Sequence, residues 1–203
     1  AVTAFVGSAY ENGAVVGALE CGQMVLMSAG LCNGKNLTGY KVIQPFLKRL
    51  GNFQDVPVVR DGQLLTARDS DACAEFVREL SRIFDPGYED DKQNVLEGHR
   101  ILIVAGQDFE DVELCVPAME LTWRGAEITL GTFSPPVVSR PPMLGLDVVM
   151  GNFGMSVPFQ ELRAERYPVV PLSELTPDGF DAILIPGAFC PWHCIEDGYV
   201  VEL

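Results

Sequence analysis

Apolar runs separated by turn residues divide this chain into short strands and amphipathic helices. Continuous apolar runs at residues 14–19, 100–105 and 181–185 are typical of strands that are buried on both faces of a parallel sheet. Apolar residues at helical spacing predict helices over residues 1–10, 23–29, 42–50, 71–84 and 111–124. Because strands and helices alternate, the pattern indicates an α/β fold, a doubly wound and mostly parallel sheet flanked by helices.

Shorter patterns complete the predicted order. Strand-like stretches lie at residues 37–40, 127–130 and 146–150, and Asp61-Gly62 joins residues 56–59 and 64–67 as a β-hairpin. A helical pattern begins at Ile195 and stops at the end of the chain, and residues 131–172 are rich in Pro and Gly. The polar, turn-rich residues 85–96 form a linker between residues 1–84 and 97–203, which we expect to form one domain together.

The predicted sheet places its candidate chemistry at the carboxyl ends of its strands. In open α/β sheets, ligands bind beyond these ends. One such end is a sharp turn, Glu20-Cys21-Gly22, between the strand at 14–19 and the helix at 23–29. Such a turn exposes one side chain beside free helix N–H groups, so Glu20 or Cys21 is the candidate reactive residue.

Composition narrows the class of protein. The 203 residues carry a formal net charge of −14, which argues against nucleic acid or an anionic membrane as a partner. No apolar stretch is long enough for a membrane span, and no signal peptide is visible. The first residue is Ala1 rather than methionine, which leaves room for an upstream segment. The six scattered cysteines are expected to be free thiols in a reducing, intracellular compartment, and no metal or other cofactor is expected.

Several ordered motifs together resemble the ThiJ/PfpI superfamily, which has a flavodoxin-like, glutamine amidotransferase-like fold and includes intracellular proteases, glyoxalases and deglycases. The motifs that carry the resemblance are residues 106–113, 180–187, 18–31, 34–40 and 58–68. Their order is reversed, because residues 97–203 resemble the family's amino-terminal half and residues 1–84 its carboxyl-terminal half. Three arrangements account for this order: a circular permutant, a processed unit of a tandem repeat, or halves swapped between chains. The break falls inside a predicted helix, which favours a repeat unit, closed on itself or swapped.

The resemblance also implies roles for individual residues. Aligned on Gly22, the family's nucleophilic cysteine falls on Glu20, whereas a slip of one residue restores Cys21 but misplaces the glycine and the helix. Glu110 corresponds to the family's acidic partner of the nucleophile.

The family's oxyanion-type loop corresponds to Gly187 and Ala188, with Phe189 and His193 beside the expected pocket. The backbone N–H groups of this loop would remain available as donors even though its side chains differ from those of the family. For Phe189 we expect a packing role rather than a place in the pocket wall. For His193 we expect a structural or surface role rather than proton transfer.

Three functions stay open from the sequence. The first is a divergent or inactive member with a binding or structural role, since fold does not imply function. The second is an acid/base enzyme, a lyase, hydratase or isomerase, using Glu20 and Glu110 on a small carbonyl compound. The third is a thiol enzyme acting through Cys21. A small-molecule ligand and a homo-oligomer or swapped halves are the expected partners.

Overall fold

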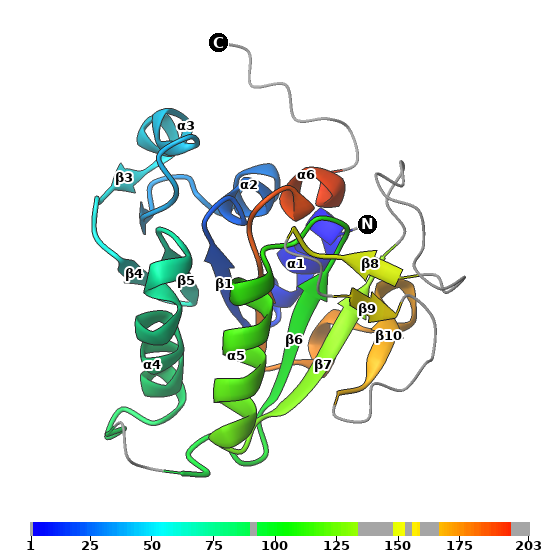
Figure 1. Ribbon diagram of the computed structural model, residues 1–203. Helices are drawn as coiled ribbons and strands as arrows, with labels where there is room; N and C mark the ends of the chain where they lie inside the picture. Colours follow the sequence, from blue (N-terminus) through cyan, green and yellow to red (C-terminus); the bar gives the residue numbers. More distant parts are fainter. Residues whose placement is uncertain (1, 90–92, 134–147, 153–155, 159–166, 196–203) are drawn as a thin grey trace.

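A mostly parallel sheet between two layers of helices forms the core of the protein, as a computed structural model of residues 1–203 shows (Figure 1). The structure describes all residues except 1, 90–92, 134–147, 153–155, 159–166 and 196–203. The seven strands of the sheet are, in spatial order, β10 (Val169–Pro171), β7 (Glu127–Thr132), β6 (Arg100–Ala105), β11 (Ala182–Ile185), β1 (Val15–Leu19), β5 (Leu64–Ala67) and β4 (Val58–Asp61). All neighbours are parallel except β4, which is antiparallel to β5. The predicted α/β fold class is confirmed.

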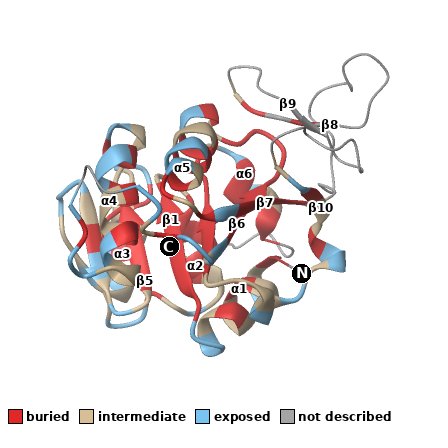
Figure 2. Ribbon diagram, turned by 90° about the horizontal axis from the view of Figure 1, so that it is seen from below, coloured by how far each residue is buried: buried red, intermediate tan, exposed pale blue. Residues whose placement is uncertain are grey.

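Helices cover both faces of the sheet, and Figure 2 shows the buried strands between them. The longer helices α4 (Cys73–Phe84) and α5 (Asp111–Trp123) pack against each other on one face. On the other face α1 (Val2–Glu11) contacts α2 (Gln23–Ser28), which in turn contacts α6 (Cys190–Cys194). The layers explain why β11, β1 and β6 after its first residue, the exposed Arg100, are apolar, because neither face of these strands meets water there.

The remaining elements are small. Strands β2 (Asn36–Leu37) and β3 (Asn52–Phe53) pair beside α3 (Gln44–Leu50), and β8 (Val148–Met150) pairs with β9 (Ser156–Pro158). Three short 3-10 helices are η1 (Ser70–Ala72), η3 (Leu172–Glu174) and η4 (Pro177–Gly179). The helix expected over residues 195–203 lies, beyond Ile195, outside the described residues.

The centre of the sheet joins the two segments that the sequence separates. Strand β11 of the second segment lies between β6 and β1, and its Ile183 aligns with Val16 of the first segment. Helix α4 packs closely on this junction, because a side chain at Gly17 would come within 2.6 Å of Phe76 and 2.7 Å of Leu184. Residues 1–84 and 97–203 therefore contribute to one sheet and one hydrophobic core.

One prediction of local structure was wrong, and a short helix was missed. The strand expected over residues 37–40 ends at Leu37, because the Thr38 N–H bonds the Thr66 hydroxyl at 3.0 Å and the Tyr40 N–H bonds the Glu20 carbonyl at 3.2 Å. The short helix α6 was not predicted, because its five residues contain Pro191 and show no helical periodicity.

Candidate functional site

A sharp turn at the end of β1 forms the centre of the candidate site. Glu20 follows the last residue of β1 and has a φ of 51°, a conformation that non-glycine residues rarely adopt. The turn closes with a 2.6 Å hydrogen bond from the Gly22 N–H to the Leu19 carbonyl. Only glycine fits at position 22, because a side chain there would collide with the carbonyl oxygens of Leu19 and Ile185.

Strained residues gather around this turn. Among the described residues, four non-glycine residues have a positive φ, and Glu20, Asp108 and Ala188 are three of them. The Ala188 N–H donates a 2.5 Å hydrogen bond to Glu20 Oε2. The Asp108 carbonyl accepts hydrogen bonds from the N–H groups that follow Ala188, at 3.1 and 3.2 Å. Such strain persists only where the surroundings hold it, and it gathers at functional sites.

Glu113, on α5, is the buried carboxyl group of the site. It is 1% exposed and accepts a 2.7 Å hydrogen bond from the Gly187 N–H and a 2.9 Å hydrogen bond from the Ser70 hydroxyl. Burial, opposed by the Gly187 hydrogen bond and reinforced by the charge of Glu20, raises the pKa of Glu113 to about 8. Glu113 is therefore a neutral acid near neutral pH.

Glu20 and Glu113 bind neighbouring donors of one loop. The Gly187 N–H faces Glu113 and the Ala188 N–H faces Glu20. A side chain at Gly187 would lie 2.5 Å from Glu20 Oε2 and 2.9 Å from Glu113 Oε2, so the two carboxyl groups flank this glycine. Two consecutive backbone donors thus each hold one carboxyl group of the protein.

Glu110 lies in the same neighbourhood but is less buried. It precedes α5, and burial followed by the charges of Glu20 and Asp111 raises its pKa, against a hydrogen bond with the Asn152 side chain. The sequence pointed to Glu110 as the acidic partner of the turn, and the structure places Glu113 in direct contact with the loop donors instead. The missed signal was a second acid three residues further on, because Glu113 lies in the first turn of the helix that Glu110 only precedes.

Cys21 is half-buried beside the carboxyl groups. Burial, with the charges of Glu20 and Glu113, raises the pKa of its thiol to about 12. The same causes, burial first and the charge of Glu113 next, raise the pKa of the buried Cys73 to about 12. These thiols stay protonated near neutral pH, and a thiol is a far weaker nucleophile than a thiolate.

The loop residues beyond Ala188 take separate positions. Phe189 is 62% exposed and Trp192 is 50% exposed, so neither ring fills the site. His193 Nε2 lies 3.7 Å from Asp108 Oδ2, which links α6 to the loop before α5. Within the described part of the chain, no group of three His, Cys, Asp or Glu side chains could hold a metal ion.

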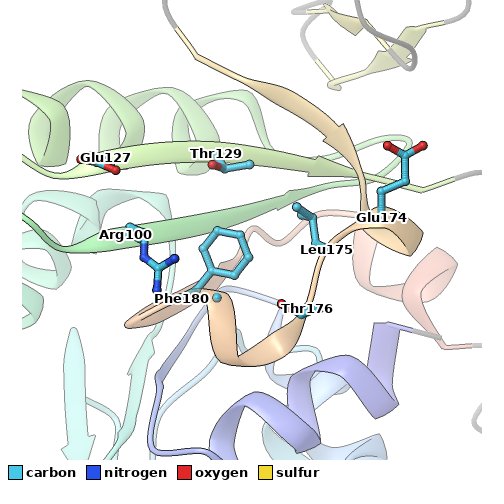
Figure 3. Close-up of a pocket in the computed structure, with 8 residues that line it drawn as sticks. Arg100, Glu127, Thr129, Glu174, Leu175, Thr176 and Phe180 are labelled. Carbon is cyan, nitrogen blue, oxygen red and sulfur yellow. The ribbon is translucent and has the colours of Figure 1, made fainter.

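A groove of 310 Å³ lies at the other end of the strands (Figure 3). It is lined by residues that include Arg100 of β6, Glu127 of β7, and Phe180 in the segment before β11. Its position is at the amino ends of the strands, whereas Glu20, Gly187 and residues 106–110 follow the carboxyl ends of β1, β11 and β6. Strain and buried carboxyl groups mark the carboxyl ends as the candidate site.

Comparisons with known proteins indicate similarity to the DJ-1/PfpI family. The DJ-1/PfpI family model matches residues 1–83. "Protein DJ-1 homolog D" of Arabidopsis thaliana is 22% identical over 199 residues, which are 95% of this chain and 48% of that protein. "Deglycase PfpI" of Pyrococcus furiosus is 29% identical over 104 residues, 51% of each chain. The chain thus spans about half the length of the curated relatives it matches.

One solved structure is also similar in part. It is a two-domain protein from Anabaena variabilis that contains DJ-1/ThiJ/PfpI-like and ferritin-like domains. The match has a TM-score of 0.39 and 29% identity, and it covers 46% of this chain and 29% of that protein.

Proposed function

The chain belongs to the ThiJ/PfpI superfamily. On that premise we propose that it is a non-classical member, in which the carboxylate of Glu20 stands at the turn after β1 in place of the family's thiol. Its role is binding or structural rather than thiol catalysis. One observation carries the proposal: the backbone donors at Gly187 and Ala188, which could hold an oxyanion, already bind Glu113 and Glu20. A substrate oxygen would have to displace a carboxyl group of the protein.

The state of Cys21 supports the same proposal. A pKa of about 12 leaves only about one molecule in 10⁵ with a thiolate near neutral pH. Burial and the neighbouring charge of Glu20 oppose the negative charge that a nucleophilic cysteine needs.

Alkylation of the thiols tests this function. With iodoacetamide near neutral pH, followed by mass mapping of the six cysteines, we expect Cys21 to react far more slowly than free glutathione. Glu20→Cys should add a thiol that reacts faster than Cys21, and Cys21→Ser serves as the control for assignment. Rapid, selective alkylation of Cys21 in the unmodified protein would show that thiol chemistry is retained.

A second candidate function, acid/base catalysis on a small carbonyl compound, is supported by the neutral state of Glu113. A neutral acid beside the carboxylate of Glu20 pairs a proton donor with a base. In such a reaction Glu20 would remove a proton next to the carbonyl group, and Glu113 would donate one to its oxygen.

Deuterium exchange into small aldehydes and ketones, followed by NMR, tests the second function. Glu20→Gln and Glu113→Gln should each abolish catalysed exchange, and Glu110→Gln should reduce it. If Glu20→Gln and Glu110→Gln both leave a measured activity unchanged, this second function is wrong.

We also propose that copies of the chain associate through α5. Val112, Met119 and Trp123 are between 42% and 49% exposed and follow a heptad-like spacing on the helix. An exposed apolar stripe of this kind is typical of an interface. Sedimentation velocity tests it: Met119→Lys should shift the protein to a smaller species, whereas Val42→Lys, at a remote exposed site, should not.

The order of the two segments supports the proposal that this chain is one unit of a tandem repeat. A single match covers 95% of the chain in its own order within 48% of the Arabidopsis protein. The mass of the primary translation product, before any processing, tests this proposal: a value well above that of 203 residues agrees with it, and a value for 203 residues contradicts it.

The proposed location is a reducing compartment. All six cysteines are free in the structure. Among the described residues, no helix has the length and apolar character needed to cross a bilayer. Thiol-trapping during denaturing lysis of cells tests this location, with six modified thiols as the expected result.

A further inference from the structure

A stretch without acidic residues interrupts this otherwise acidic chain. Residues 21–54 contain no Asp or Glu, but they contain Lys35, Lys41, Lys48 and Arg49. The rest of the chain holds all 28 acidic residues against the remaining 10 Lys and Arg, a net charge of −18. The segment folds around β2, β3 and α3, which lie together at the β4 side of the molecule (Figure 1).

The exposed side of α3 carries these charges. Ile43 and Leu47 face the core, whereas the opposite side, here called the α3 outer face, consists of Lys41, Val42, Pro45, Lys48 and Arg49, all exposed. Val42 is 61% exposed, so this basic face includes an apolar position.

The cations of the α3 outer face have no acidic partner among the residues that the structure describes. Lys35 pairs with Asp61 at 3.2 Å, but Lys41, Lys48 and Arg49 form no ion pair with any residue that the structure describes. Lys48 and Arg49 lie in the last turn of α3, where cations favour the helix carbonyl groups. The helix carbonyl groups therefore explain why Lys48 and Arg49 stand where they do. They do not explain why residues 21–54 contain no acidic residue.

We propose that the α3 outer face binds a short acidic peptide segment of a partner protein. Its carboxylates would pair with Arg49 and with Lys41 and Lys48, whose ammonium groups lie over the rings of Tyr40 and Phe53 at 5.6 and 5.5 Å, and an apolar side chain would contact Val42. Complementary charge gives such contacts their specificity and speed of association.

The size of the face favours a short segment. Charges are screened beyond about 8 Å at physiological salt, so a short segment bound here is influenced mainly by the local positive charge. A nucleic acid or an anionic membrane would extend over the acidic remainder and be repelled. A second copy of this chain carries a net charge of −14, so the acidic remainder of the molecule would repel it as well.

The face also lies close to the candidate site. The Tyr40 N–H, directly before Lys41, donates a 3.2 Å hydrogen bond to the Glu20 carbonyl. A partner on the α3 outer face would therefore be held next to the strained turn. The proposal does not depend on the chemistry of that turn.

Fluorescence anisotropy tests the proposal with the full chain. The probe is a fluorescein-labelled hexapeptide of five Asp or Glu residues and one Leu, titrated at low and at physiological salt. We expect binding at low salt that weakens as salt rises. Lys41→Gln, Lys48→Gln and Arg49→Gln together should weaken binding at least about tenfold.

A matched triple variant removes the same amount of charge elsewhere. Arg60→Gln, Arg82→Gln and Arg100→Gln together should change the affinity by no more than about threefold. Equal losses in the two triple variants would overturn the proposal, because they would indicate a general charge effect. Absence of binding at low salt would also overturn it, as would tighter binding to phosphatidylserine vesicles or a DNA oligonucleotide than to the peptide.

Discussion

At the scale of single residues, the candidate site rests on backbone positions that few side chains could occupy. Glu20, Asp108 and Ala188 hold left-handed conformations, and hydrogen bonds between their loops maintain them. Each such position costs about 1–3 kcal/mol, which the surrounding packing must offset.

Gly22 offers a direct test of the turn. Gly22→Ala places a methyl group against the carbonyl oxygens of Leu19 and Ile185, so we expect a loss of about 1–3 kcal/mol in the free energy of unfolding. Urea denaturation measures this. Gly7→Ala is the control, because that helix position has open space and should gain up to about 1 kcal/mol. Equal stability of the two variants would contradict the turn geometry.

Glu113 links pH to stability. Its pKa in the folded protein, about 8, lies above the ordinary 4.5, so the folded state binds this proton more tightly than the unfolded state. The contribution of Glu113 is therefore fully present below pH 4.5 and is lost as pH rises through about 8. Glu113→Gln should be more stable than the unmodified protein by about 5 kcal/mol above that range, with little difference at the acidic end.

Denaturation at a series of pH values checks this prediction. The exposed Glu75→Gln variant is the control and should give a profile parallel to that of the unmodified protein. A constant difference between Glu113→Gln and the unmodified protein at all pH values would contradict the assignment of Glu113 as a buried neutral acid.

At the scale of elements, the segment that joins the two halves is anchored to the end of α5. Arg124, 5% exposed, donates a 2.8 Å hydrogen bond to the Tyr88 hydroxyl. The Leu96 N–H bonds the Arg124 carbonyl at 2.9 Å, and the Leu96 side chain is fully buried. The polar composition of residues 85–96 predicts a linker but not these anchors.

Tyr88→Phe tests the anchor. It leaves a buried Arg124 N–H without its acceptor, so we expect a loss of about 1–3 kcal/mol in the free energy of unfolding. Thermal or urea denaturation measures it, and Tyr40→Phe, at a half-buried tyrosine remote from the linker, is the matched control. A loss as large in the control would show that the effect is not specific to the anchor.

At the scale of the whole molecule, the junction of β6, β11 and β1 makes the two segments depend on each other. Without its partner, either segment would expose one edge of the central sheet and the apolar faces of its helices. The packing of α4 on α5 connects the segments a second time.

We therefore expect one cooperative unfolding transition. Trp123 and Trp192 both lie in the second segment, so their fluorescence follows residues 97–203, whereas far-ultraviolet circular dichroism follows both segments. Urea midpoints from the two probes should coincide. Separate midpoints would show that the segments fold independently.

Most of the core could be predicted from the sequence because its strands are buried on both faces. The runs that became β1, β6 and β11 are apolar at every buried position, which few other structures allow. Strand β10 and helix α6 escaped prediction because each is short, and α6 contains Pro191. Their positions depend on tertiary contacts rather than on periodicity.

By itself, the sequence determined the α/β fold and the carboxylate at the turn after β1, because both follow from local pattern and from the glycine at position 22. Only the tertiary structure decided which acid accompanies Glu20. Glu110 precedes α5 whereas Glu113 lies in its first turn, and the packing of α5 beneath the 187–188 loop directs Glu113 onto the Gly187 N–H. The state of that carboxyl group depends on burial, and burial is a property of the assembled sheet and helices.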